Sequence, residues 1–159
     1  AVAAAAPPNP AEAAPSIDGG PRALRILAAE DNPTNQLVLR TIMQTFGVDL
    51  TMVSDGLQAV DAWKGGDFDL ILMDIQMPVM DGVAATRLIR ETETASSRRR
   101  IPIVALSANA MTHQVAEYLG AGMDLHVAKP IELSKLHAAL REATEGQANF
   151  PIDGTGAAA

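Results

Sequence analysis

Residues 70–78 are Leu70-Ile71-Leu72-Met73-Asp74-Ile75-Gln76-Met77-Pro78, an apolar run that is interrupted by an acid. The run before the acid is typical of a strand that is buried on both faces of a parallel sheet. A carboxylate at its end is costly unless a metal ion, a cation or a reaction compensates the charge. Asp74 is therefore the first candidate functional residue of the chain.

Three other apolar runs also end in polar side chains. They lead to Glu30-Asp31, to Ser107 and to Lys129. The carboxyl ends of parallel strands meet at one edge of an open sheet, which is where α/β proteins place their sites. We therefore expect these residues to gather around Asp74.

Strand and helix patterns alternate from Leu24 to Ala143. Asn32 suits a helix N-cap, Pro33 suits the first helical position and Gly47 suits a helix stop. Five β/α units of this length predict a doubly wound, three-layer α/β sandwich with a five-stranded parallel sheet. The predicted strands are 24–28, 48–53, 68–73, 101–106 and 125–128, and the predicted helices are 33–46, 56–64, 82–93, 111–119 and 131–143. The inward-facing residues expected from the second, third and fifth helices are Leu57, Val60, Trp63, Val83, Leu88, Ile89, Leu133, Leu136 and Leu140.

Composition divides the chain into three parts and excludes several classes of site. Residues 1–22 are predicted to be an Ala/Pro-rich linker, 23–145 the folded domain and 146–159 a disordered tail. The 159 residues carry a net charge of −7, which argues against a nucleic-acid surface, and Arg98-Arg99-Arg100 is interpreted as a solvated loop. The chain has no cysteine, and no apolar run reaches the roughly 20 residues of a membrane span. We expect a cytoplasmic domain that is not inserted in a membrane.

The converging carboxylates point to a cation. Glu30, Asp31 and Asp74 would repel one another by several kcal/mol at low dielectric. Mg²⁺ removes this repulsion and leaves room for a phosphoryl oxygen. With Lys129 as a second positive charge and Ser107 as a donor, the set predicts phosphoryl transfer to Asp74. Taken singly, the acid pair, Ser107 and Lys129 would each have an ordinary interpretation as helix-end or surface residues.

Four motifs strengthen this hypothesis together: Glu30-Asp31-Asn32, Leu72-Met73-Asp74 with Met77-Pro78 and Asp81-Gly82, Ala105-Leu106-Ser107-Ala108, and Gly122-Met123-Asp124 followed by Lys129-Pro130. They resemble the response regulator receiver (CheY-like) family over essentially all of Leu24–Ala143, most of all the receivers of hybrid sensor histidine kinases. The Ala/Pro stretch would suit a cut from such a kinase. The resemblance implies a flavodoxin-like (βα)5 fold with strand order 2-1-3-4-5. It also implies transfer from a phosphohistidine, dependence on Mg²⁺, slow self-hydrolysis of the acyl phosphate and a change in partner binding.

The resemblance also implies a role for each matching residue. Asp31, Asp74 and the backbone carbonyl of Gln76 would bind Mg²⁺, and Glu30 would act through a water. Asp74 would accept the phosphoryl group, and Lys129 would bridge to it.

Two further roles concern the response to phosphorylation and the lifetime of the phosphate. Ser107 would supply the hydroxyl of the conformational switch that responds to phosphorylation. Gln76 and Asn109 would tune the lifetime of the phosphate.

One position departs from the family pattern. The family usually has Tyr or Phe two residues before the Ala-Lys pair of the last strand, and this chain has His126 there. A histidine ring could still turn toward Ser107, but it is smaller and titratable. Two interpretations stay open: a pH-sensitive output face, and a half-exposed edge histidine without a special role.

In such systems the phosphodonor is a histidine kinase or a histidine-phosphotransfer domain. It would dock over the first helix and the loop at Lys129-Pro130, whose peptide bond is cis in this family. The candidate contacts are Asn35, Leu37, Val38 and Ile131.

Three other functions compete with this one. A scaffold that keeps the fold without phosphorylation is opposed by the complete acidic set and Lys129. A phosphatase with an aspartyl nucleophile needs a second acid two residues after Asp74, where this chain has Gln76. A DNA-binding regulator is not expected, because no output domain follows the last predicted helix in this sequence. The oligomeric state is open.

Overall fold

The computed structural model describes residues 23–108 and 111–144, and these residues form one five-stranded parallel sheet. The strand order is β2-β1-β3-β4-β5, and all four strand pairings are parallel. The predicted doubly wound fold and its strand order are confirmed. The strands are β1 (Arg25–Ala29), β2 (Asp49–Val53), β3 (Leu70–Asp74), β4 (Ile103–Ser107) and β5 (Leu125–Ala128). The predicted linker and tail and Asn109 lie outside the described residues.

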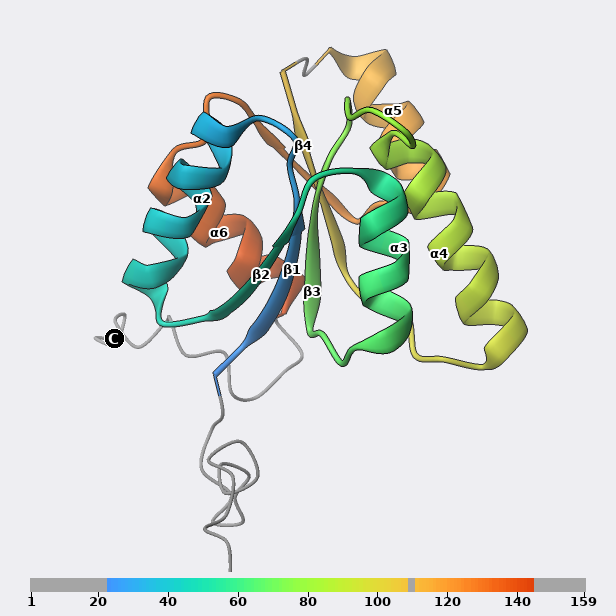
Figure 1. Cartoon of the computed structure of the whole chain (residues 1–159). Helices are drawn as coiled ribbons and strands as arrows, with labels where there is room; N and C mark the ends of the chain where they lie inside the picture. Colours follow the sequence, from blue (N-terminus) through green and yellow to red (C-terminus); the bar gives the residue numbers. More distant parts are fainter. Residues whose placement is uncertain (1–22, 109–110, 145–159) are drawn as a thin grey trace, which may run out of the picture.

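Five helices cover the two faces of the sheet (Figure 1). Two of them, α2 and α6, lie on one face, and the other three lie on the opposite face. Each face therefore has a hydrophobic core of its own, and β1, β3 and β4 contribute side chains to both. The helices are α2 (Pro33–Phe46), α3 (Gly56–Gly65), α4 (Gly82–Ser96), α5 (Thr112–Ala121) and α6 (Leu133–Ala143).

The ends of α2 follow from local chemistry, as predicted. The Asn32 side chain accepts hydrogen bonds from the backbone N–H groups of Thr34 and Asn35, and Pro33 occupies the first helical position. Gly47 ends the helix with φ 71° in the left-handed region, where a side chain is strained. The start of α2 fixes the direction in which the preceding acid pair leaves β1.

Two of the expected inward-facing residues were wrong. Leu57 is 42% exposed and Leu133 is 48% exposed, whereas Val83 and Leu88 are partly buried and pack against the core of their face. Leu57 and Leu133 lie in the first turns of α3 and α6. Burial starts one turn later, as at Leu136 on α6. An apolar residue in a first turn is a weaker sign of burial than one in mid-helix.

Several element ends also differ from prediction by one to three residues. Strand β3 continues to Asp74 and β4 to Ser107, so both polar residues keep sheet geometry. Helix α6 begins at Leu133, two residues later than predicted, after Glu132 as its N-cap residue. The two functional side chains are therefore held by the sheet itself and not by a following loop.

The interpretation of Arg98-Arg99-Arg100 as a solvated loop is confirmed, since the three residues lie outside any helix or strand and Arg99 and Arg100 are exposed, but their side chains also make specific contacts. The Arg98 guanidinium lies 4.1 Å from the centre of the Trp63 ring and donates to the carbonyl of Trp63 at the end of α3. Arg99 donates to the carbonyl of Phe68. Arg100 pairs with Asp124 at 2.7 Å. These arginines fasten the loop after α4 to neighbouring elements.

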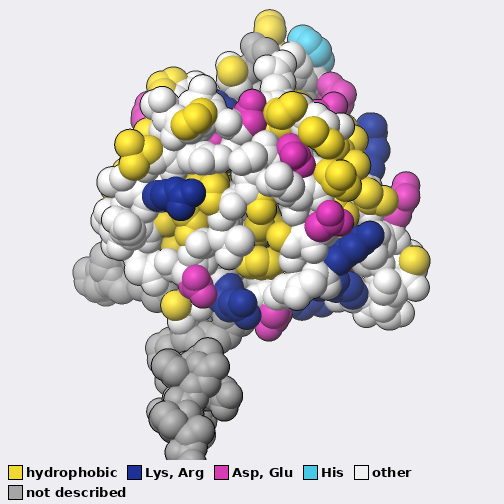
Figure 2. Space-filling view, in the orientation of Figure 1, with side chains coloured by type: hydrophobic (Ala, Val, Ile, Leu, Met, Phe, Trp, Pro, Cys, Tyr) yellow, Lys and Arg dark blue, Asp and Glu magenta, His cyan; other side chains and the backbone are white. Residues whose placement is uncertain are grey.

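The face of the molecule seen in Figure 2 has no large area of one charge. Acidic and basic side chains intermingle in the space-filling view, with apolar side chains between them (Figure 2). Among the described residues, no helix has the length and apolar character that crossing a membrane would require.

Candidate functional site

Asp74 is the last residue of the central strand β3 and lies almost fully buried, at 3% exposure. Its partner across the strand pair is Leu106 on β4, and the backbone N–H of Ile75 donates to the Leu106 carbonyl. The carboxylate therefore stands at the carboxyl edge of the sheet next to the end of β4. This is the position that the apolar run before Asp74 predicted.

Glu30 and Asp31 follow β1 at the same edge. Glu30 is fully buried, and its Oε2 accepts hydrogen bonds from the Asn32 backbone N–H and the Asn35 side chain. The Gln36 side chain donates to the Glu30 carbonyl at 2.6 Å. The first turn of α2 thus holds Glu30 rigidly, while Asp31 is exposed to solvent.

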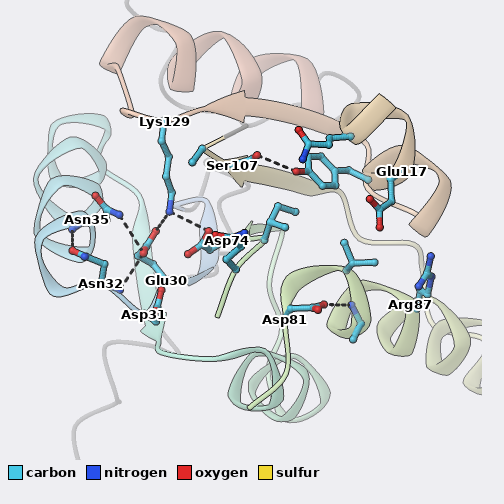
Figure 3. A pocket seen from close by; sticks show the side chains of 17 residues that line it. Glu30, Asp31, Asn32, Asn35, Asp74, Asp81, Arg87, Ser107, Glu117 and Lys129 are labelled. Atoms are coloured by element: carbon cyan, nitrogen blue, oxygen red, sulfur yellow. Dashed lines mark hydrogen bonds and ion pairs between the residues drawn. The ribbon is translucent and has the colours of Figure 1, made fainter. Parts of the chain in front are cut away.

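Lys129 brings a cation between the two buried carboxylates (Figure 3). Its Nζ lies 3.0 Å from Asp74 Oδ1 and 3.0 Å from Glu30 Oε1. Burial raises the pKa of Asp74 to about 6, the Glu30 carboxylate adds to the rise, and the bond to Lys129 opposes it. Burial would lower the pKa of Lys129, but its bonds to Glu30 and Asp74 outweigh burial and raise it. One lysine does not fully compensate two carboxylates.

The remaining charge suits a divalent cation. Glu30, Asp31 and Asp74 each offer a carboxylate oxygen, and these oxygens lie within 4.8 Å of one another. Oxygen-only donors of this charge fit Mg²⁺, which keeps several waters in protein sites. Gln76 also lines the cavity, and the role of its carbonyl as a ligand stays a prediction.

The acids open into a cavity of about 730 Å³ at the carboxyl edge of the sheet. Ser107 and Lys129 line it with the acids, so the structure brings together all five residues predicted for the centre of the site. The cavity continues between α4 and α5 to Arg87 and Glu117 (Figure 3). It therefore offers room for a phosphoryl group and part of its donor.

Ser107 contacts a residue that the sequence did not single out. The Ser107 Oγ and the Tyr118 hydroxyl lie 3.1 Å apart, and both residues are buried. Tyr118 comes from α5 and also lines the cavity. The His126 ring is stacked on the Tyr118 ring, with centroids 6.1 Å apart. Both interpretations of His126 stay predictions.

The predicted docking residues lie near the site but differ in exposure. Leu37 is 64% exposed, whereas Val38 and Ile131 are partly buried against the core below α2 and α6. The Asn35 amide donates to Glu30, so Asn35 also shapes the site. The Lys129–Pro130 bond is cis, as the resemblance implied.

Sequence reasoning did not assign Asp81, Arg87, Glu117 or Tyr118 to the site, although all four line the cavity. Asp81 caps α4 through its bond to the Ala84 N–H, and its place before Gly82 in a quoted motif was the available signal. For Tyr118 the signal was its being the only tyrosine of the chain. Arg87 and Glu117 carried no local signal, because only the packing of α4 beside α5 brings them to one rim.

Gly82 sets the distance between α4 and the end of β3. A Cβ at this position would overlap the backbone carbonyl oxygen of Asp74. We expect Gly82→Ala to lower the free energy of unfolding by about 1–3 kcal/mol, because neither backbone can yield without moving the site. Urea unfolding measures this. Gly65→Ala is the control, since no atom lies within 4 Å of its added Cβ. Equal stabilities of the two variants would contradict the close approach.

Fold and site together define a flavodoxin-like α/β domain whose strand ends hold an acid cluster, a serine and a lysine. The model of the response regulator receiver domain family matches residues 26–141. This chain belongs to the response regulator receiver family.

Curated relatives and solved structures agree with this assignment. Sensor protein GacS of Pseudomonas syringae pv. syringae is 43% identical over 115 residues, which are 72% of this chain and 13% of GacS. The chain thus matches a small part of a much longer relative.

Two solved structures show the same fold. One is the receiver domain of sensor histidine kinase PA1611 from Pseudomonas aeruginosa, which has a magnesium ion in its active site cleft. It matches this chain with a TM-score of 0.69 and 39% sequence identity, and the match covers 78% of this chain and 99% of that one. The other is the receiver domain of Saccharomyces cerevisiae Ssk1 in complex with the histidine phosphotransfer protein Ypd1. It matches with a TM-score of 0.68 and 32% sequence identity, and the match covers 79% of this chain and 89% of that one.

Proposed function

We propose that this chain is a phospho-accepting domain that takes a phosphoryl group from a phosphohistidine onto Asp74. The observation that carries the proposal is the contact of Lys129 Nζ with Asp74 Oδ1 at 3.0 Å, in a cavity shared with Glu30 and Asp31. A lysine at this distance stabilises charge on the oxygens of an incoming phosphoryl group. The magnesium ion in the active site cleft of the Pseudomonas aeruginosa receiver supports a similar ion here.

The transfer needs one nucleophile and several charge-neutralising groups. An Asp74 oxygen attacks phosphorus, the P–O bond forms and the P–N bond breaks, and the electron pair stays on the histidine nitrogen. Lys129 compensates charge on the phosphoryl oxygens and Ser107 donates a hydrogen bond to one of them. When bound by Asp31 and Asp74, Mg²⁺ supplies further neutralisation of those oxygens.

Loss of the phosphoryl group needs a water at phosphorus. Gln76 is exposed and lines the cavity two residues after Asp74, so its side chain can shield or admit that water. Asn109, which lies outside the described residues, is also proposed to tune the lifetime of the phosphate, as the family resemblance implies.

Intact-mass spectrometry tests the proposal. The protein is incubated with acetyl phosphate, with Mg²⁺ or with EDTA. We expect the mass of one phosphoryl group to be added with Mg²⁺, and peptide mapping to place it on Asp74. A chain that never gains this mass would instead be the scaffold alternative, which binds partners without being phosphorylated.

The relatives suggest the setting of this reaction. Hybrid histidine kinases carry domains like this one, and Ssk1 forms a complex with a histidine phosphotransfer protein. We propose that the donor here is a histidine kinase or a histidine-phosphotransfer domain in the cytoplasm, and that phosphorylation changes the binding of a partner. Membership of a hybrid kinase is part of this proposal.

The proposed docking surface consists of Asn35, Leu37, Val38 and Ile131. Leu37 is its most exposed apolar residue, so a charge there should not disturb the core, unlike a charge at Val38. We expect Leu37→Asp to slow transfer from phosphorylated histidine-phosphotransfer domains by about tenfold or more, with acetyl phosphate uptake unchanged. Radiolabel transfer from a panel of such domains measures this.

The control for Leu37→Asp is a charge introduced on the helix layer that covers the other face of the sheet, formed by α3, α4 and α5. Leu119 on α5 is 47% exposed and lies on the other face of the sheet. Leu119→Asp should leave transfer unaffected. If it slows transfer as much as Leu37→Asp does, the docking surface has been assigned to the wrong face.

A further inference from the structure

The buried contact between Tyr118 and Ser107 has no part in the function proposed so far. The two hydroxyl oxygens lie 3.1 Å apart, and Tyr118 is 4% and Ser107 2% exposed. Both residues line the cavity that holds Asp74, and a dashed line marks their bond in Figure 3. A solvent-shielded hydroxyl pair beside a reaction site is strongly held, because water does not compete for it.

We propose that Tyr118 is a positioning residue for Ser107: its hydroxyl donates to Ser107 Oγ and so directs the Ser107 proton to a phosphoryl oxygen on Asp74. Through this relay, α5 is linked to the phosphorylation state of the site. The inference rests on the proposed function, because the relay ends at the phosphoryl group.

Acidity sets the direction of the bond. A phenol, with a pKa near 10, is far more acidic than an alkyl alcohol, so the tyrosine is the better donor and the serine oxygen the better acceptor. A hydroxyl that accepts one hydrogen bond becomes a stronger donor in the next. The second bond would go to an ionised oxygen, and such bonds are roughly twice as strong as neutral ones.

The backbone ties the same serine to the lysine of the site. The Lys129 N–H donates to the Ser107 carbonyl at 2.8 Å, so the serine main chain is held by the residue that follows β5 while its side chain is held by α5. His126, on β5, packs its ring against the ring of Tyr118. The aromatic hydroxyl near Ser107 thus comes from α5, and the β5 histidine supports it from the side.

The chain contains one tyrosine, which gives the experiment a single reporter. Protein labelled with ¹³C at tyrosine Cζ should show one resonance from Tyr118. Beryllofluoride with Mg²⁺, a non-transferable analogue of a phosphoryl group on a carboxylate, should shift this resonance. The shift should be lost in Ser107→Ala and kept in Ser107→Thr, which restores the hydroxyl.

Affinity for beryllofluoride gives a second measurement. Tyr118→Phe keeps the ring and removes the hydroxyl, and we expect it to weaken binding about 2- to 10-fold, the range that one neutral hydrogen bond supplies. In the Ser107→Ala background the same change should have no further effect, because the relay is already broken. A loss of packing alone would instead be additive.

Thr144→Val is the matched control for hydroxyl removal. Its hydroxyl is fully buried and donates to the Leu140 carbonyl at 2.7 Å on α6, and it does not line the cavity. It should lower stability without changing beryllofluoride affinity. Thermal unfolding of each variant is measured alongside.

The outcomes separate the two proposals. A parent that binds no beryllofluoride would overturn the proposed function and the relay with it. A parent that binds it with an unmoved Tyr118 resonance, or a Tyr118→Phe variant that binds equally well or more tightly, would overturn the relay alone.

Discussion

An Asp74→Asn variant is expected to take up no phosphoryl group from acetyl phosphate under conditions in which the parent takes up one. The amide has no anionic oxygen to attack phosphorus, and the neighbouring acid Glu30 is bonded to Lys129 and the start of α2. Intact-mass spectrometry measures the uptake. If the variant gains the same mass as the parent, another residue is the acceptor and the assignment of Asp74 is refuted.

The same substitution is expected to stabilise the fold without Mg²⁺. The pKa of Asp74 is raised from 3.8 to about 6 by burial, so the folded chain holds this proton more tightly than the unfolded chain does. Ionisation therefore costs stability, and the cost builds up between pH 3.8 and about 6 and is complete above that. Near neutral pH, Asp74→Asn should gain about 1–3 kcal/mol in unfolding free energy, after allowance for the lost bond to Lys129.

Urea unfolding at two pH values checks this prediction. The advantage of the variant should shrink toward pH 4, where the parent's Asp74 is protonated. Saturating Mg²⁺ should stabilise the parent more than the variant, because binding to the folded state adds to its stability. A variant that is less stable than the parent at neutral pH would show that the Lys129 bond outweighs the burial cost.

An Asp31→Asn variant is expected to lose Mg²⁺ affinity by about 10- to 100-fold. Asp31 offers an oxygen within 4.8 Å of the oxygens of Glu30 and Asp74, and its replacement removes one of three negative charges around the ion. Asp31 is exposed, so the fold should be unaffected. Isothermal titration calorimetry with MgCl₂ measures the affinity directly, without phosphorylation.

An acid outside the site provides the comparison for Asp31→Asn. Asp61 lies on α3, is exposed and does not line the cavity, so Asp61→Asn removes the same charge at a distance. Its Mg²⁺ affinity should equal that of the parent. Should both variants lose affinity equally, Mg²⁺ would be held by the overall charge of the protein and not by a built site.

Much of the site could be predicted because its chemistry is encoded where the strands end. Buried parallel strands are recognisable as apolar runs, and the residue after each run must reach the carboxyl edge of the sheet. Asp74, Ser107 and Lys129 were found in this way. The start of α2 was equally clear, since Asn32 and Pro33 act through bonds to their immediate neighbours.

The errors occurred where burial depends on distant parts of the chain. Leu57 and Leu133 have the spacing of core residues, but each lies in the first turn of its helix and is exposed. The loop at residues 98–100 was predicted correctly, but the contacts of its arginines were not, because nothing near them in the sequence indicates their partners. Their positions over Trp63 and beside Asp124 exist only because α3 and β5 pack next to that loop.

The sequence by itself determined the fold class, the strand order through its family motifs, and the identity of the acids, serine and lysine at the sheet edge. Local rules suffice for the fold class and for the residues at the strand ends, because periodicity, helix caps and strand ends involve neighbours along the chain, whereas the strand order came from the family resemblance alone. Only the tertiary structure decided that Lys129 lies between Glu30 and Asp74, and that Tyr118 of α5 meets Ser107. Such contacts join residues separated by up to 99 positions and depend on how helices pack on the sheet, which no local pattern records.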